Sequence, residues 1–171
     1  QEIENIINNK IKKSICEIAN DNADGQVIIS GDIESVQIIQ TFLKEKKIKS
    51  IPLKVSAPFH CSLMKPAAET MREKINNIKF NIPKNEIISN VTGKVEKEPD
   101  ILKKLLVDQI FSTVKWRESI ILMSKLGVTN FVEIGPGKVL SGMVKRTLKD
   151  VKCFSINSIA DIKKLDYGFK K

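Results

Sequence analysis

The sequence predicts an α/β fold, in which short strands alternate with helices along the chain. In several segments, apolar residues recur every three or four positions, which is typical of helices with one buried face. Short runs rich in Val and Ile separate these segments and end at Gly, Asn or Asp, as strands that lead into turns do. Because the two kinds of element alternate and do not form separate blocks, we expect the α/β class.

The first 55 residues are expected to form a helix, a strand, a helix and a strand. Ile residues at spacings of three and four predict the first helix, and the stretch rich in Asn, Asp and Gly after it predicts a turn. Asp32 stands where the N-cap of the second helix is expected. The four elements are expected at residues 2–18, 26–30, 33–47 and 51–55. This order fits a ferredoxin-like βαββαβ unit that has lost its opening strand, so we expect an incomplete ferredoxin-like subdomain over residues 1–55.

Residues 56–158 are expected to be the C-terminal part of a larger α/β domain. Pro66 falls in the first turn of one expected helix, where its missing N–H does no harm, and Gly127 ends another. The expected helices cover residues 63–78, 100–111, 115–126 and 138–149, and the expected strands cover residues 86–91, 130–134 and 153–156. The remaining residues, 159–171, form a basic tail that we expect to be frayed.

The composition fits a globular protein and excludes several classes. No apolar run approaches the roughly 18 residues that a membrane span needs. Three Cys without a CxxC pair suit reduced thiols better than disulfides or zinc ligands, and a single His excludes any site built from two. The first residues show no signal-peptide pattern and no initiator Met, so we expect a cytoplasmic protein whose chain begins inside a longer one.

The net charge of +9, from 29 Lys and Arg against 20 Asp and Glu, favours acidic partners. The lysines are scattered, and aromatic residues make up only 5% of the chain without alternating with arginine as a base-stacking surface requires. A solvated, Lys-rich surface is therefore favoured over a nucleic-acid interface. An anionic ligand or an acidic protein partner also fits this charge.

Two short motifs are candidates for chemistry. The stretch Ser56-Ala57-Pro58-Phe59-His60-Cys61 lies between an expected strand and an expected helix, where α/β sheets place catalytic loops. His60 has the right chemistry for a general base near neutral pH, although its residue type alone favours a structural or surface histidine. Cys61 is interpreted as a buried, inert thiol. The stretch Glu133-Ile134-Gly135-Pro136-Gly137-Lys138 matches neither a Walker motif nor GxGxxG, so a tight turn is favoured over an anion site.

Several stretches match one family in that family's own order across nearly the whole chain. They are residues 18–31 (IANDNADGQVIISG), 55–66 (VSAPFHCSLMKP), 90–91, 107–110, 114–116 and 133–140 (EIGPGKVL). Together they resemble the malonyl-CoA:acyl carrier protein transacylase family. Members of that family carry upstream a Gly-His-Ser-Leu-Gly nucleophile elbow, a Gly-Gln-Gly string and a malonyl-binding arginine, whose counterparts are absent from these 171 residues. The resemblance implies the C-terminal part of an α/β-hydrolase-like acyltransferase domain.

The resemblance implies roles for four residues of this chain. His60 matches the family's general base, and Gln109 matches the residue whose main-chain carbonyl accepts the Nδ1–H of that histidine. Phe59 stands where malonyl-selective members place a bulky residue beside the substrate, and Asn22 is expected at the entrance of the site. The implied reaction is ping-pong transfer of malonyl from coenzyme A to the phosphopantetheine thiol of acyl carrier protein, in fatty acid biosynthesis. It uses malonyl-CoA as substrate and needs no metal or redox cofactor.

The implied partners are malonyl-CoA, acyl carrier protein and a complementary N-terminal acyltransferase segment, with no membrane and no nucleic acid. Because the nucleophilic serine of the Gly-His-Ser-Leu-Gly elbow is absent from these residues, the chain alone is expected to be inactive. Two alternatives stay open: a non-catalytic remnant that binds carrier protein or a partner chain, and a basic nucleic-acid-binding module. A salt-dependent shift with random duplex DNA would favour the second alternative.

Overall fold

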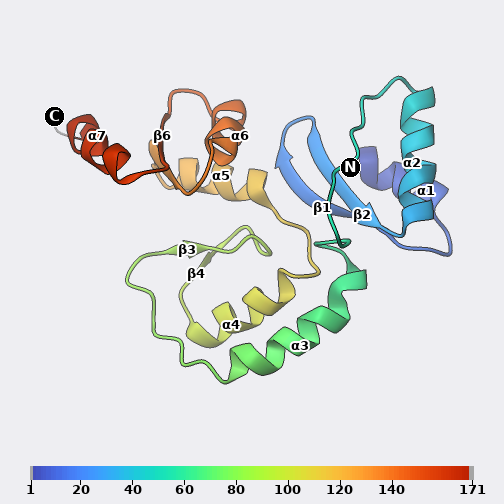
Figure 1. The fold of residues 1–171 in the computed structure, drawn as a ribbon, viewed down its shortest axis with the longest axis horizontal. Coiled ribbons are helices and arrows are strands. Elements are labelled where there is room, and N and C mark those ends of the chain that lie inside the picture. Colours follow the sequence, from blue (N-terminus) through green and yellow to red (C-terminus); the bar gives the residue numbers. More distant parts are fainter. Residues whose placement is uncertain (1, 170–171) are drawn as a thin grey trace.

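The structure is a computed structural model that describes the backbone of residues 2–169 and the side chains in that range other than those of residues 164 and 166–169. Its elements form three groups that follow one another along the chain (Figure 1). Residues 2–45 lie at the right of the view, residues 62–108 in the lower part and residues 116–169 at the upper left. Helices and strands are interspersed along the whole described chain and do not form separate blocks, which confirms the predicted α/β class.

The first group is a two-stranded antiparallel sheet with two helices packed beside it. Its elements are α1 (Glu2–Lys10), β1 (Cys16–Ala23), β2 (Gln26–Gly31) and α2 (Ile33–Glu45). A small core of Ile7, Cys16, Ile39 and Leu43 joins the helices to β1. Asp32 is the N-cap residue of α2 as predicted, but its side chain accepts a hydrogen bond from the Ile15 amide at 2.7 Å and not from its own helix.

Two expectations for this group are wrong. The helix expected over residues 2–18 ends at Lys10, and residues 11–15 connect it to the strand β1, which was not expected. β1 takes up the last three residues of the expected helix and the beginning of the turn expected after it. Ile15 and Ile18 continue the helical spacing, but pairing with β2 gives this segment's backbone groups partners that a lone helix end lacks. The strand expected over residues 51–55 does not form, and Ile51, Leu53 and Val55 are more than half exposed. The observed order is therefore helix, strand, strand, helix.

The second group is a pair of packed helices with a short hairpin. It contains a single 3-10 turn η1 (Ser62–Met64), α3 (Lys65–Asn76), β3 (Ile87–Ile88), β4 (Val95–Glu96) and α4 (Pro99–Asp108). Ala68 and Ile75 of α3 pack against Val107 of α4 in a second core cluster. The strand expected over residues 86–91 is shorter because the chain turns after Ile88, where Gly93, with φ of 65°, donates its N–H to the Ser89 carbonyl at 2.8 Å.

The third group is a parallel strand pair with its crossover helix. Its elements are α5 (Trp116–Lys125), β5 (Asn130–Ile134), α6 (Val139–Thr147), β6 (Lys152–Ile156) and α7 (Ile159–Phe169). β5 pairs with β6 in parallel, from Asn130 opposite Lys152 to Ile134 opposite Ile156, and the predicted strands and helices of this region are confirmed to within three residues. The tail that was expected to be frayed forms α7 instead, and residues 170–171 lie outside the described residues. In residues 2–169, no helix combines the length and the apolar character that crossing a bilayer requires.

The molecule exposes more surface than a folded monomer of its mass, and large apolar side chains are part of that surface. The accessible surface is 12192 Å², whereas a folded monomer of 19.2 kDa is expected to expose about 8,400 Å², so the excess is roughly 3,800 Å². Ile134 and Val139, at the end of β5 and the start of α6, are 80% and 65% exposed. Parallel sheets are normally covered on both faces, so the β5–β6 pair has the surface of a sheet that lacks part of its cover.

Candidate functional site

His60 lies in the irregular loop that leads into η1, and two neighbouring carbonyls hold it. Its backbone N–H donates to the Ile110 carbonyl at 3.2 Å, and its Nδ1 is 2.8 Å from the Gln109 carbonyl oxygen. Both carbonyls lie just after α4, where a helix leaves its last acceptors without partners. The structure therefore brings together His60 and Gln109, the two residues for which the resemblance implied a catalytic contact.

This contact determines which ring nitrogen of His60 carries the proton. A carbonyl oxygen can only accept a hydrogen bond, so Nδ1 must be the donor in the contact with Gln109. In the neutral ring, Nε2 then keeps its lone pair and is able to take a proton. The ring is thus held in the tautomer that a general base acting through Nε2 requires.

The backbone of His60 is in an unusual conformation. Its φ is 59°, in the left-handed region that few residues other than glycine adopt, although histidine is enriched among them. Such a conformation persists where the surrounding contacts leave no alternative, and it is frequent at functional sites. In this loop, Cys61 contributes to the fixation because its buried thiol donates to the Pro58 carbonyl at 3.2 Å. The expected burial of Cys61 is confirmed.

Asn90 also belongs to this site, although no pattern in the sequence indicated it. Its side-chain amide donates to the Gln109 side-chain oxygen at 3.3 Å, and its carbonyl accepts the Lys115 N–H at 2.7 Å. Asn90 thereby ties the residue that holds His60 to the start of α5. The stretch at residues 90–91 was part of the resemblance, but nothing in its spacing indicated this contact.

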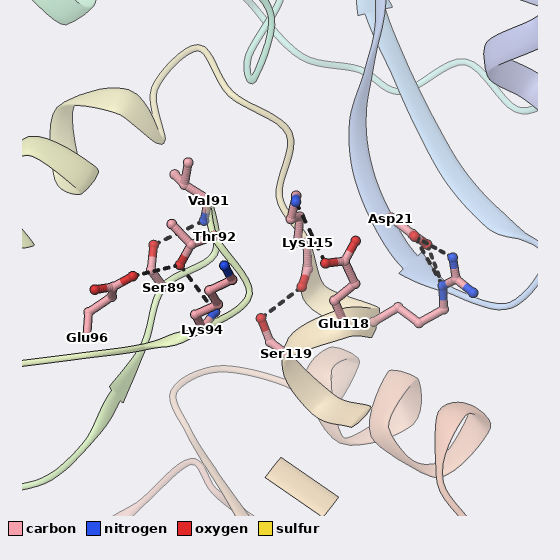
Figure 2. A network of polar contacts seen from close by, with 10 residues as sticks. Asp21, Ser89, Val91, Thr92, Lys94, Glu96, Lys115, Glu118 and Ser119 are labelled. Carbon is pink, nitrogen blue, oxygen red and sulfur yellow. Dashed lines mark hydrogen bonds and ion pairs between the residues drawn. The ribbon is translucent and has the colours of Figure 1, made fainter. Parts of the chain in front are cut away.

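β1 fixes the segment between α4 and α5 from the other side. Val114 donates its N–H to the Ala19 carbonyl at 2.8 Å and accepts the Asp21 N–H at 2.9 Å. Arg117 binds the Asp21 carboxylate through two nitrogens at 2.6 to 3.1 Å, and this ion pair raises the pKa of Arg117. Figure 2 shows Asp21 on β1 facing the first turn of α5, near Lys115.

The other two predicted site residues differ in their exposure. Phe59 is 46% exposed, next to His60, so its ring is available to a ligand. Asn22 is only 6% exposed near the end of β1, and the hydrogen bonds among residues 2–169 include none between its side chain and His60. The place of Asn22 at the entrance of a site stays a prediction.

The Gly-Pro-Gly motif is a tight turn, as the sequence analysis favoured. Gly135 and Gly137 have φ of 138° and 95°, which suit glycine. The Glu133 carboxylate accepts the amide hydrogens of Leu140 and Ser141 in the first turn of α6 at 3.1 and 2.8 Å, and hydrogen bonds from Ser141 lower its pKa. The amides that an external anion would use are therefore bound by the chain's own carboxylate.

Comparisons with known proteins identify the family of this chain. The acyl transferase domain family matches residues 7–166. The malonyl CoA-acyl carrier protein transacylase of Haemophilus influenzae is 41% identical over 142 residues, which are 82% of this chain and 46% of that protein. The chain spans about half the length of the curated relatives it matches.

Solved structures give the same result. A malonyl CoA-acyl carrier protein transacylase from Clostridium perfringens superposes with a TM-score of 0.92 at 36% identity, over 98% of this chain and 53% of that one. A chain from the complex between a type II PKS acyl-carrier protein and its malonyl-transacylase superposes with a TM-score of 0.90 at 33% identity, over 96% and 54%. The chain belongs to the acyl transferase domain family.

Proposed function

We propose that this chain is the C-terminal part of a malonyl-CoA:acyl carrier protein transacylase and that His60 is its general base. The observation that carries the proposal is the 2.8 Å contact between His60 Nδ1 and the Gln109 carbonyl. It leaves Nε2 as the proton acceptor, which is the state that activation of a serine hydroxyl requires. The names of the relatives supply the substrate class, malonyl-CoA and acyl carrier protein.

The proposed reaction has two half-reactions that use the same base. First, His60 Nε2 takes the proton of a serine hydroxyl while the serine oxygen attacks the malonyl thioester, and the departing coenzyme A thiolate receives that proton. Next, Nε2 takes the proton of the phosphopantetheine thiol, the thiolate attacks the malonyl-serine ester, and the proton returns to the serine. In both steps, the Gln109 carbonyl accepts the Nδ1–H and stabilises the imidazolium. Phe59 borders the acyl group and Asn22 lies at the entrance.

We propose that the serine comes from a complementary N-terminal acyltransferase segment, because these 171 residues contain no Gly-x-Ser-x-Gly string. Two observations support such a partner. The excess of roughly 3,800 Å² of accessible surface on this one chain exceeds the roughly 1,000–2,500 Å² that one side of an obligate interface commonly buries, so it leaves ample surface for such a partner. The order helix, strand, strand, helix over residues 2–45 is also the interior of a βαββαβ unit, so the partner would supply the opening strand of a ferredoxin-like lobe. We place the boundary to the larger acyltransferase part at residue 55.

The test is to assemble this chain with the part of the Haemophilus influenzae relative that precedes the matching region, a combination called here the two-piece enzyme. Transfer of radiolabelled malonyl from coenzyme A to acyl carrier protein is measured. The control is the Haemophilus influenzae protein itself, divided at the same place. We expect transfer by the two-piece enzyme and none by either piece alone. If the divided control is active and the assembled two-piece enzyme is not, the proposed function is wrong.

A further inference from the structure

We propose that Glu17, on β1, is a positioning residue that holds the His60 loop in its active conformation through Ser62. This inference rests on the proposed function, because it assigns to Glu17 an effect on the base of that reaction. Glu17 touches neither His60 nor the reacting atoms by any hydrogen bond among the described residues. Its effect is therefore expected on the geometry of the base and not on the chemistry itself.

Glu17 forms a two-pronged contact with Ser62, 45 residues further along the chain. Glu17 Oε2 accepts the Ser62 backbone N–H at 2.8 Å, and Glu17 Oε1 accepts the Ser62 hydroxyl at 2.5 Å. Both residues are half-buried, and hydrogen bonds to a carboxylate are stronger than those between neutral groups. Ser62 opens the continuous turn and helix η1–α3, so the carboxylate also satisfies an amide that a helix start leaves without an acceptor.

The contact matters for His60 because it fixes the other end of the same short loop. Cys61 alone separates Ser62 from His60, and it is fully buried with extended backbone angles, so it transmits the position of Ser62 directly. On one side, the carbonyls of residues 109 and 110 hold the His60 ring and backbone. On the other side, Glu17 holds Ser62. With both ends fixed, the loop keeps His60 at φ of 59°, a conformation that its residue type would otherwise leave.

The two anchors of the loop belong to one frame. β1, which carries Glu17, bonds through Ala19 and Asp21 to Val114, a few residues after the two carbonyls that bind His60. Backbone hydrogen bonds therefore fix the distance between the Glu17 carboxylate, which holds Ser62, and the Gln109 carbonyl, which holds His60. Without the Glu17 carboxylate, only the Gln109 side of the loop stays held, and the Nδ1–H of His60 is free to lose its acceptor.

The variants separate positioning from charge and from general folding. Glu17→Ala removes the contact, Glu17→Asp keeps the charge but retracts the carboxylate by one methylene, and Glu17→Gln keeps an oxygen that accepts the Ser62 N–H and an amide able to donate to its hydroxyl. Glu73→Ala, on the exposed side of α3, is the matched control because it removes a carboxylate that has no part in the loop. All are measured in the two-piece enzyme, well below its melting temperature.

In the complete transfer of malonyl to acyl carrier protein by the two-piece enzyme, we expect Glu17→Ala to lower kcat by about 10- to 100-fold, the usual cost of a displaced catalytic group, while KM for malonyl-CoA changes little. Glu17→Asp should lower kcat by at least about 5-fold for the same reason, and it still decides the question if Glu17→Ala does not fold. Glu17→Gln should recover most of the parent rate. Glu73→Ala should equal the parent.

A second readout does not need activity. His60 is the only histidine of this chain, so labelling this piece alone with ¹⁵N-histidine gives one imidazole in the NMR spectrum. Its nitrogen shifts distinguish the two neutral tautomers. We expect the Nδ1–H form alone in the parent and in Glu17→Gln, and a mixture of both forms in Glu17→Ala and Glu17→Asp.

The outcomes keep this inference apart from the proposed function. An inactive parent whose His60 tautomer still depends on Glu17 would contradict the proposed function and support the positioning contact. An active parent in which Glu17→Ala and Glu17→Asp keep both the parent kcat and the single tautomer would overturn the inference. The same holds if Glu17→Asp is stable, folded and loses its rate only through a higher KM.

Discussion

Replacing His60 by Ala and by Asn separates its chemical role from its structural one. Neither side chain can act as a base near neutral pH, so malonylation of the two-piece enzyme should fall by about 10²–10⁴-fold in both variants, the usual contribution of a positioned general base. The two differ in what they retain. Asn has an amide N–H that can replace the Nδ1–H in the bond to the Gln109 carbonyl, and it tolerates the φ of 59° that Ala disfavours.

The stability effects follow from the same contacts. His60→Ala loses one hydrogen bond of 2.8 Å from a half-buried ring, which is worth about 0.5–1.5 kcal/mol of unfolding free energy. His60→Asn keeps both the bond and the backbone preference, so its unfolding free energy should stay within about 0.5 kcal/mol of the parent value, the range of a neutral substitution. A large rate loss without a stability loss in His60→Asn is the signature of a base.

The assay is a single-turnover measurement with malonyl-CoA, quenched at set times, alongside urea unfolding of each variant. The base assignment is wrong if His60→Asn malonylates at the parent rate. A second result would also contradict it: His60→Ala loses both malonylation rate and unfolding free energy, whereas His60→Asn keeps the parent values of both. His60 would then act through the fold and not as a proton acceptor.

Three further predictions concern the chain alone, the specificity and one carboxylate. The 171-residue chain by itself should transfer no malonyl, and it should self-associate or aggregate because it exposes sheet and apolar surface. Sedimentation at several concentrations tests the association. A stable monomer with a sharp, concentration-independent melting transition would contradict it. Phe59→Ser should reduce the preference for malonyl- over methylmalonyl-coenzyme A by ~1–3 kcal/mol, the usual contribution of a methylene-sized contact. The ratio of the kcat/KM values for the two substrates measures this preference, and an unchanged ratio would show that Phe59 does not determine specificity. Glu133 has a lowered pKa in the fold, so its stabilisation is present above its ordinary pKa of 4.5 and is lost as the pH falls through the folded value. The difference in unfolding free energy between the parent two-piece enzyme and Glu133→Gln should therefore be largest above pH 4.5 and shrink at lower pH, and a difference that is constant with pH would contradict the capping role.

Local patterns predicted the elements that depend on local chemistry. The strand β5, the glycine turn and the helix α6 were predicted nearly to the residue, because a β-rich run, two glycines and a helical spacing all agree there. β1 was missed because Ile18 continues the helical repeat and the Asn- and Asp-rich residues after it are typical of a turn, and only pairing with β2 makes this segment a strand. The strand expected at residues 51–55 needs a neighbouring strand, which the described residues do not supply.

In the candidate site, too, some residues could be predicted from the sequence, whereas contacts between distant segments could not. The resemblance identified His60 and Gln109, and the structure brings the two within hydrogen-bond distance. Residue patterns gave no sign of Asn90, which contacts Gln109, or of the contact between Glu17 and Ser62, because these pairs are 19 and 45 residues apart. The first contact depends on how the loop after β3 packs against the end of α4, and the second on how β1 packs against the start of η1, so no spacing within one segment encodes either of them.

The mass of the protein after incubation with malonyl-CoA, without carrier protein, tests the central claim most directly. A ping-pong reaction must stop at the covalent malonyl-serine when no thiol acceptor is present. The two-piece enzyme should gain one malonyl group, on the Haemophilus influenzae piece, and this gain should be slowed by about 10²–10⁴-fold in His60→Ala. A stable malonyl group on the 171-residue chain itself, or equally fast malonylation without His60, would contradict the account.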